Sequence, residues 1–347
     1  MQLFLCHTPL HLLISLLVAQ KNSSAEKLIF AVIEDSQGLH ALAQKLVVSK
    51  NIDLLLLPGA ANTQSLLKSA LIHRANAKHL HDTYARAVDT VFIFHDLRAE
   101  SQKLLNSEVA RHTGVRFVLL EDGVALYEPG GFLVDGFVSI LKRKIFWDIR
   151  WKHARELGLH PRLSEIQCFY PELLRSNLRH LCVKSLPKHL AGNISAPSLL
   201  KAPLSNAPFC IVAVPHFAFG ENFIREFLIS SRDYCFDRRL NLLLKLHPRD
   251  MVTKATIEQV ISSPVYLPQE LPLEVLLLSI PKAAVLIGSR TSALHVANVL
   301  QSNITCLYFD KPSTVEGVRW INFFTSIGIG KIQEPEEEDA NINIYGV

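Results

Sequence analysis

The sequence lacks the residue patterns that mark several large classes of enzyme. It contains no phosphate-loop GxxxxGK[ST], no dinucleotide-binding GxGxxG and no zinc-binding HExxH. Kinase-like, dinucleotide-dependent and zinc-hydrolase functions therefore have no support. The six cysteines include no close CxxC pair, which argues against a zinc site or a disulfide framework and favours a reducing compartment.

Long apolar runs are also missing. No stretch reaches the ~18 uninterrupted apolar residues that a membrane-spanning helix needs. The apolar residues 12–19 are preceded by His7, Thr8, Pro9 and His11, and they lack the basic region and cleavage site of a signal peptide. We therefore expect a cytoplasmic protein without a membrane span, in which Pro9 opens a helix.

Charge of one sign is not in large excess. The 36 basic and 32 acidic residues leave a formal net charge of +4, which gives no reason to expect a nucleic acid as partner. About half of the residues are apolar, at 49%, as in an ordinary globular enzyme. The 347 residues are enough for two domains of about 150 residues each.

Short apolar runs alternate with helix-length amphipathic segments along the chain, a pattern typical of parallel βα units. Strands are expected at residues 3–6, 28–33, 53–57, 90–94, 115–120, 209–214, 240–246, 265–267, 283–287 and 305–309. Residues 191–208 are rich in Ala, Ser, Asn and Pro and predict a linker. The expected domains are therefore residues 1–190 and 209–347.

The first candidate motif is Glu121-Asp122-Gly123, directly after the strand-like residues 115–120. A carboxylate at a strand end can take a proton from a hydroxyl, and a neighbouring carboxylate can raise its pKa by repulsion. Gly123 allows a positive φ and a close approach of substrate. The alternative is an ordinary Asp-Gly turn followed by a helix cap.

The second motif is His247-Pro248, directly after the strand-like residues 240–246. His247 could donate a hydrogen bond to a phosphate leaving group, with Pro248 fixing the backbone. Lys245 lies two residues earlier, on the same face of the strand. The alternative is a buried structural histidine. A similar triplet, His160-Pro161-Arg162, follows residues 151–159, which we expect to be helical, and it is interpreted as the end of that helix.

The third motif, residues 288–292, precedes a helix expected at residues 293–300. Hydroxyls of Ser289, Thr291 and Ser292, together with free N–H groups, could bind a nucleotide phosphate; the alternative is a Ser/Thr helix cap. Arg290 either serves the phosphate or a sugar carboxylate, or points outward. Glu274 could accept both hydroxyls of a ribose, or it only favours the dipole of its helix.

These motifs, in this order and at strand ends, resemble those of bacterial sialyltransferases with (D/E)(D/E)G, HP and SS/ST motifs. The lipooligosaccharide sialyltransferases and capsule polysialyltransferases look most similar. The resemblance implies the GT-B fold, an α/β architecture of two Rossmann-like domains whose parallel sheets face a central cleft. In that fold the N-terminal domain binds the acceptor, the C-terminal domain binds the CMP-sugar, and the last helix can cross back.

The resemblance also implies roles for single residues. Asp122 corresponds to the catalytic base, with Glu121 as a supporting carboxylate and His247 acting on the leaving group. The residues expected to bind CMP are Lys245, His247, Pro248, Glu274, Ser289, Thr291 and Ser292. Candidate contacts to the acceptor or the donor sugar are His7, Thr8, Gly123 and His216.

The expected activity is an inverting transfer, without metal or cofactor, of sialic acid or a related nonulosonic acid from its CMP-sugar. The expected acceptor is an oligosaccharide or glycolipid of the cell surface, lipooligosaccharide or capsule, that ends in galactose or a related sugar. Alternatives are a capsule polymerase, a Kdo-type transferase of the same fold, or a non-catalytic capsule-assembly protein.

The basic and aromatic residues 142–152 suggest peripheral contact with the anionic inner face of the bacterial inner membrane. The alternative is a solvated helix whose aromatic side chains lie in the core.

Overall fold

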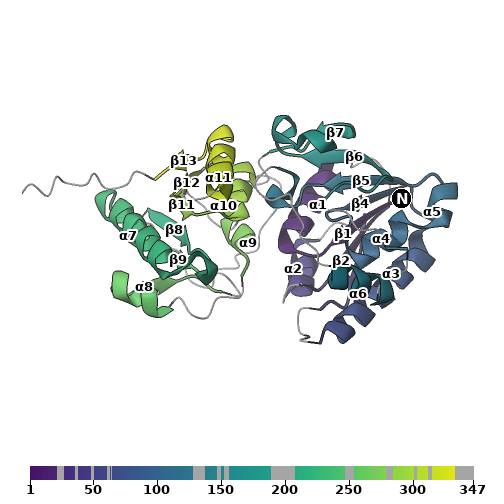
Figure 1. The fold of residues 1–347 in the computed structure, drawn as a ribbon, viewed down its shortest axis with the longest axis horizontal. Coiled ribbons are helices and arrows are strands. Elements are labelled where there is room, and N and C mark those ends of the chain that lie inside the picture. The colour runs from purple at the N-terminus through teal and green to yellow at the C-terminus, as the bar shows by residue number, and fades with distance from the viewer. Residues whose placement is uncertain are drawn as a thin grey trace, which may run out of the picture. The chain divides into compact units, whose positions relative to one another are not determined.

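The protein contains two parallel sheets with helices packed against them (Figure 1). The computed structural model describes residues 1–21, 27–35, 38–47, 51–60, 63, 65–127, 137–146, 150–151, 156–188, 208–246, 254–269, 271–278, 284–300, 303–311 and 315–332. Contacts divide the chain into a first unit, Met1–Leu199 with Glu274–Ser279 and Val299–Ser302, and a second unit, the remainder. The predicted α/β class with parallel sheets is confirmed, and the predicted linker lies, except for Pro208, outside the described residues.

The first sheet has seven parallel strands in the order β3-β2-β1-β4-β5-β6-β7. The strands are β1 Gln2–Cys6, β2 Leu28–Ile33, β3 Ile52–Leu57, β4 Thr90–Ile93, β5 Arg116–Leu120, β6 Leu163–Cys168 and β7 Cys182–Ser185. The helices are α1 Pro9–Lys21, α2 Leu39–Leu46, α3 Leu66–Tyr84, α4 Ala99–Leu105, α5 Glu108–His112 and α6 Phe137–Phe146. The strand order reverses between β1 and β4, the place where open α/β sheets bind ligands.

The β1–α1 unit lies at the centre of this sheet. Strand β1 pairs with both β2 and β4, and Phe4 stacks on Phe92 of β4 with ring centroids 4.3 Å apart. Helix α1 begins at Pro9, as predicted, and its residues from Leu10 to Ala19 are all buried. The N-terminal apolar run is therefore a core helix. No helix among the described residues is long and apolar enough to cross a bilayer.

The second sheet has six parallel strands in the order β10-β9-β8-β11-β12-β13. The strands are β8 Phe209–Ala213, β9 Asn241–Lys245, β10 Val265–Tyr266, β11 Ala284–Gly288, β12 Ile304–Tyr308 and β13 Gly330–Lys331. The helices are α7 Glu221–Asp237, α8 Lys254–Val260, α9 Leu273–Leu278, α10 Ser292–Leu300 and α11 Val315–Ser326. Here the order reverses between β8 and β11.

Three strands and one turn differ from the sequence-based prediction. Strands β6, β7 and β13 were not predicted, because polar residues such as Glu165 interrupt their apolar pattern. The helix predicted at residues 151–159 is wrong over its described part, since residue 156 forms a bridge and residues 157–158 form a turn. Buried Asp96 accepts hydrogen bonds there from the N–H groups of Gly158 and His160, at 3.1 and 3.0 Å. His160 therefore fixes a turn and does not end a helix.

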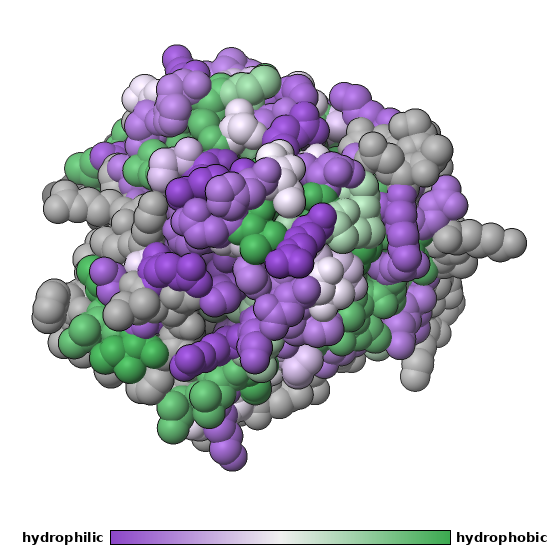
Figure 2. Space-filling model, turned by 90° about the vertical axis from the view of Figure 1, so that its right-hand side faces the viewer, coloured by the Kyte–Doolittle hydropathy of each residue, from purple (hydrophilic) through white to green (hydrophobic). Residues whose placement is uncertain are grey.

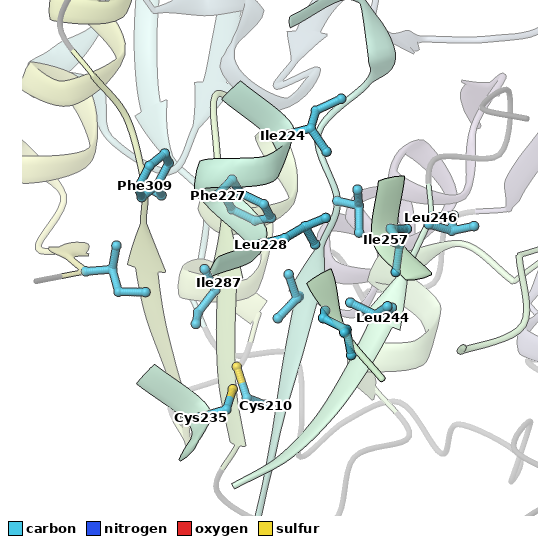
Figure 3. Close-up of a cluster of buried hydrophobic side chains, with 14 residues drawn as sticks. Cys210, Ile224, Phe227, Leu228, Cys235, Leu244, Leu246, Ile257, Ile287 and Phe309 are labelled. Atoms are coloured by element: carbon cyan, nitrogen blue, oxygen red, sulfur yellow. The ribbon is translucent and has the colours of Figure 1, made fainter. Parts of the chain in front are cut away.

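A compact apolar core lies beneath α7 in the second unit (Figure 3). Phe227 is fully buried and packs edge-on against Phe309, with ring centroids 5.8 Å apart. The thiols of Cys210 and Cys235 lie in the same core, and both are free. Because this core joins α7 to β8, β9 and β11, it fixes the positions of these three strands relative to the helix.

Replacing Phe227 by Ala should lower the free energy of unfolding by about 3–5 kcal/mol, because it leaves a cavity in a closely packed core. Phe236 is the matched control, since it lies on the same helix and is 82% exposed. Its replacement by Ala should change the free energy of unfolding by about 0.5 kcal/mol or less. Denaturant titration followed by circular dichroism measures both, and equal effects would contradict the packing described.

Candidate functional site

Asp122 lies directly after β5, at the carboxyl edge of the first sheet. Its side chain is 30% exposed, and Oδ1 lies 3.0 Å from Nε2 of His11. The next residue, Gly123, begins a 3₁₀ turn (η1, Gly123–Leu126) and has φ 54°, a value that glycine adopts without strain. The carboxylate is thus accessible to a substrate and held on one oxygen.

Sequence reasoning did not single out His11. The residue is in the first turn of α1 and only 2% exposed, with its ring stacked on Phe94, the centroids 4.0 Å apart and the planes at 4°. The N–H of His7 donates to Nδ1 of His11 at 3.2 Å. The only signal in the sequence was the His-Thr-Pro-Leu-His spacing at the end of the first strand. That spacing does not reveal a partner 111 residues away.

The electrostatic surroundings favour the ionised form of Asp122. Burial raises the pKa of this carboxyl, but His11, His95 and Arg98 together outweigh burial and hold the pKa below its ordinary value. The raised pKa that repulsion by Glu121 would give is therefore not found, and Glu121 is not among the main causes of the shift. Alternate residues at a strand end point to opposite sides, so the two carboxylates do not share one environment.

Glu121 is buried and serves the structure of the sheet edge. Its Oε2 accepts hydrogen bonds from the hydroxyl of Tyr127 and from the N–H of Phe169, the latter at 2.7 Å. Only 1% of the residue is exposed. The carboxylate therefore ties the end of β5 to the residues that follow β6.

His7 and Thr8 connect β1 to α1. The His7 ring is buried, and its Nδ1 lies 2.8 Å from Oδ2 of Asp35, which Arg98 also contacts at 3.2 Å. Burial lowers the pKa of His7, so the ring is neutral and donates from Nδ1 to the carboxylate. Thr8 Oγ1 accepts from the N–H of His11 at 3.2 Å and caps α1. Both residues hold the turn in place.

His73 and Glu100 extend this buried network. Nδ1 of His73 lies 2.8 Å from Glu100 and its Nε2 lies 3.5 Å from Asp35. Burial, the largest single effect, lowers the pKa of His73, but contact with Glu100 and Asp35 leaves it raised overall. Among the described residues, no cluster of three or more His, Cys, Asp or Glu side chains is arranged to hold a metal ion.

The third motif lies at the carboxyl end of β11, beside the reversal point of the second sheet. Gly288 admits no larger residue, since an added Cβ would lie 2.9 Å from the Thr291 side chain. Thr291 Oγ1 accepts from the N–H of Ala293 at 3.2 Å, at the start of α10. The Oγ of Ser289 is buried and has no hydrogen-bond partner within the described part of the chain. Hydroxyls and helix N–H groups thus converge here.

Arg290 is neither exposed nor turned to solvent. Its guanidinium forms two hydrogen bonds, of 2.8 and 2.9 Å, with the buried carboxylate of Asp310 after β12. The same group lies 5.6 Å from the ring centre of Phe219. The outward orientation considered from sequence is therefore wrong, and Arg290 fastens the third motif to two neighbouring loops.

The remaining residues that were predicted to bind CMP are only partly described. Lys245 is buried at the end of β9, and its Nζ donates to the carbonyls of Pro268 and Gln269 at 2.7 and 3.0 Å. His247 and Pro248 lie outside the described residues. Glu274 is half-buried in the first turn of α9. Their expected contacts with CMP therefore stay predictions.

His216 follows β8, on the other side of the reversal point from the third motif. Its Nδ1 accepts from the N–H of Ala218 at 3.2 Å, and its ring packs against Phe217 with centroids 4.2 Å apart. Phe217 is half-exposed. The loop thus presents a histidine and an aromatic ring at the edge where a donor would bind.

Two parallel α/β sheets, each with polar side chains at the carboxyl edge of its reversal point, form the architecture of the GT-B fold. A family model described as alpha-2,8-polysialyltransferase (POLYST) matches residues 2–309. The chain belongs to this family and is a glycosyltransferase of the sialyltransferase class. No curated protein matches it significantly.

Solved structures share the fold at low sequence identity. The α/β-galactoside α-2,3-sialyltransferase of Photobacterium phosphoreum has a TM-score of 0.56 and 10% identity, over 95% of this chain and 98% of that one. A Photobacterium sp. JT-ISH-224 2,6-sialyltransferase, with CMP and lactose, has a TM-score of 0.51 and 12% identity, over 94% and 76%. A UDP-N-acetylglucosamine 2-epimerase from Listeria monocytogenes has a TM-score of 0.56 and 10% identity, over 92% of this chain and 81% of that one. These likenesses establish the fold alone.

Replacing Glu121 by Ala should lower the free energy of unfolding by at least about 2 kcal/mol, because two buried donors lose their acceptor. Glu121→Gln keeps an oxygen for Tyr127 and Phe169 and should recover most of that loss. Asp122→Asn, the matched control at the next position, keeps an acceptor for His11 and should change stability less than Glu121→Ala. Denaturant unfolding measures all three, and wild-type stability of Glu121→Ala would contradict this role.

Proposed function

We propose that this protein transfers sialic acid, or a related nonulosonic acid, from its CMP-sugar to a hydroxyl of a cell-surface glycan. The observation that carries the proposal is the Asp122 carboxylate, ionised, partly exposed and held on one oxygen at the carboxyl edge of the first sheet. Membership of the polysialyltransferase family supports the choice of sugar. Asp122 acts as the base of the reaction.

In the proposed reaction the acceptor hydroxyl gives its proton to Asp122 while its oxygen bonds to the anomeric carbon of the sugar. The bond between that carbon and the phosphate oxygen breaks, and CMP leaves with the electron pair. Attack from the face opposite CMP inverts the anomeric configuration. In the proposed reaction no metal ion takes part, and groups at the third motif bind the phosphate.

The leaving phosphate is assigned to the third motif. The unpartnered Oγ of Ser289, the N–H groups at the start of α10, and the hydroxyls of Thr291 and Ser292 support this assignment. His247 assists as the donor to the leaving oxygen. Glu274 binds the ribose, and Lys245, already bound to two backbone carbonyls, contributes positive charge beside the nucleotide.

The acceptor is proposed to be lipooligosaccharide or capsule glycan. The family is described as α-2,8-polysialyltransferase, so a glycan that ends in sialic acid is a second candidate acceptor beside the galactose-terminated one considered from sequence. Neutral and sialylated oligosaccharides are therefore both tested. His216, beside the reversal point of the second sheet, and Gly123, next to the base, are retained as contacts to the sugars.

Purified protein in EDTA should release CMP from CMP-N-acetylneuraminate when a sialylated or galactose-terminated oligosaccharide is present. Asp122→Asn should nearly abolish transfer and leave CMP binding intact, because the base touches the acceptor and not the nucleotide. Product mass spectrometry measures transfer, and calorimetry measures CMP binding. Normal turnover of Asp122→Asn would refute the assignment of the base, and activity that needs added Mg²⁺ would refute the metal-independent reaction.

We further propose that the protein contacts an anionic membrane through α3 and α6, which contact one another. Figure 2 shows apolar side chains among hydrophilic ones on the side of the protein that lies on the right of Figure 1. On α3 and α6, Leu67, Leu71, Leu141 and Ile145 are 47–61% exposed. The basic residues of the same two helices include Lys68, Arg74, Lys78 and Lys144, against the single acid Asp82. An apolar surface with this excess of positive charge suits anionic lipid.

The aromatic residues predicted at this site contribute less than expected from sequence. Trp151 is buried and donates from Nε1 to the carbonyl of Leu97 at 3.0 Å, so its ring belongs to the core. Trp147 lies outside the described residues. The proposed contact therefore depends on aliphatic side chains of α3 and α6.

Lys68→Ser with Lys144→Ser should weaken binding to phosphatidylglycerol-containing vesicles by roughly thirty-fold, at about 1 kcal/mol for each cation. Leu71→Ser with Ile145→Ser should weaken it as well. Matched controls on the second unit are Arg225→Ser with Arg232→Ser for charge and Phe236→Ser for apolar exposure. Cosedimentation in low and high salt measures binding. Equal losses in the controls, or binding that is insensitive to salt, would contradict the proposed surface.

A further inference from the structure

The hydrogen bonds around His11 fix the position of its ring proton. The N–H of His7 can only donate, so Nδ1 of His11, 3.2 Å away, must accept and carries no proton. In the neutral ring the proton is therefore on Nε2, which lies 3.0 Å from Oδ1 of Asp122. His11 is thus a hydrogen-bond donor to the carboxylate.

The donor is also held rigidly. The ring is stacked on Phe94, which prevents it from swinging toward or away from Asp122. The backbone of His11 is fixed by Thr8 at the start of α1. The His7 side chain is anchored to Asp35 by a 2.8 Å hydrogen bond, which in turn fixes the N–H that selects the tautomer. Three independent contacts thus determine where the Nε2 proton points.

We propose that His11 is a positioning residue for the reaction: it holds Oδ1 of Asp122 and leaves Oδ2 as the oxygen that takes the acceptor's proton. The inference rests on the proposed function, since it concerns the base named there. A carboxylate bound on one oxygen has fewer rotamers, so its free oxygen is preorganised for the acceptor hydroxyl. His11 itself touches neither substrate.

The groups that face Asp122 come from two parts of the chain. His11 belongs to α1, whereas His95 and Arg98 belong to the segment between β4 and α4. Burial lowers the pKa of His95 to about 4, so it is neutral at pH 7. Removing the donor of His11 removes one of the effects that hold the pKa of Asp122 down. The acid limb of the rate profile should then move to higher pH.

Three variants separate positioning from packing. His11→Gln retains an amide donor near the place of Nε2, His11→Asn carries its amide near the place of Nδ1 and cannot reach Asp122, and His11→Leu has no donor. We expect His11→Asn and His11→Leu to lower kcat by roughly 10–100-fold, because a reacting group that is no longer held in place loses rate on this scale. KM for the CMP-sugar should not change, and His11→Gln should keep most of the activity. The acid limb of the rate profile should move to higher pH in His11→Asn and His11→Leu but not in His11→Gln.

The measurements are kcat and KM from CMP release between pH 5 and 8, with circular dichroism to check folding. If His11→Leu fails to fold, the contrast between His11→Asn and His11→Gln still decides. An equal loss of kcat in His11→Asn and His11→Gln, with the acid limb at its wild-type pH, would overturn the inference and indicate that His11 acts through packing alone. If Asp122→Asn remains active, the proposed base has failed, and that result is read independently of any His11 variant.

Discussion

Parallel strand pairing is the constraint on which the remaining structure depends. Because β1, β4 and β5 run in one direction, the residues that follow them share one edge of the sheet. His11, Arg98 and Asp122 come from three separate parts of the chain. Asp122 nevertheless lies within hydrogen-bond distance of His11, and the charge of Arg98 lowers the pKa of Asp122. The same pairing of β8, β9 and β11 brings Lys245, at the end of β9, and the third motif, at the end of β11, to one edge of the second sheet.

Buried polar networks then hold these edges in one arrangement. Asp35 contacts His7, His73 and Arg98, while Glu121 joins the end of β5 to the end of β6. In the second unit the two hydrogen bonds between Arg290 and Asp310 do the same for the third motif. Buried charges are tolerated because they are paired, and breaking one partner leaves the other unsatisfied. Such networks make each edge rigid enough to orient a reacting group.

The site combines residues that differ sharply in exposure although they are neighbours in sequence. Glu121 is 1% exposed and bound within the sheet edge, whereas the Asp122 side chain is 30% exposed and accessible to solvent. The difference follows from the alternation of side chains at the end of a strand. It explains why two adjacent carboxylates have different hydrogen-bond partners.

The alternation of apolar runs and amphipathic segments was sufficient to predict the fold class, ten of the thirteen strands in the described part of the chain, and the start of α1 at Pro9. It also located Asp122 and the third motif at strand ends, because these features are local in sequence. Strands β6 and β7 could not be predicted, since neighbouring strands, and not their own apolar pattern, stabilise them. Only the tertiary structure decided the partner of Asp122, the inward turn of Arg290 and the burial of Glu121. Each of these depends on contacts between residues far apart in the chain, which no short pattern records.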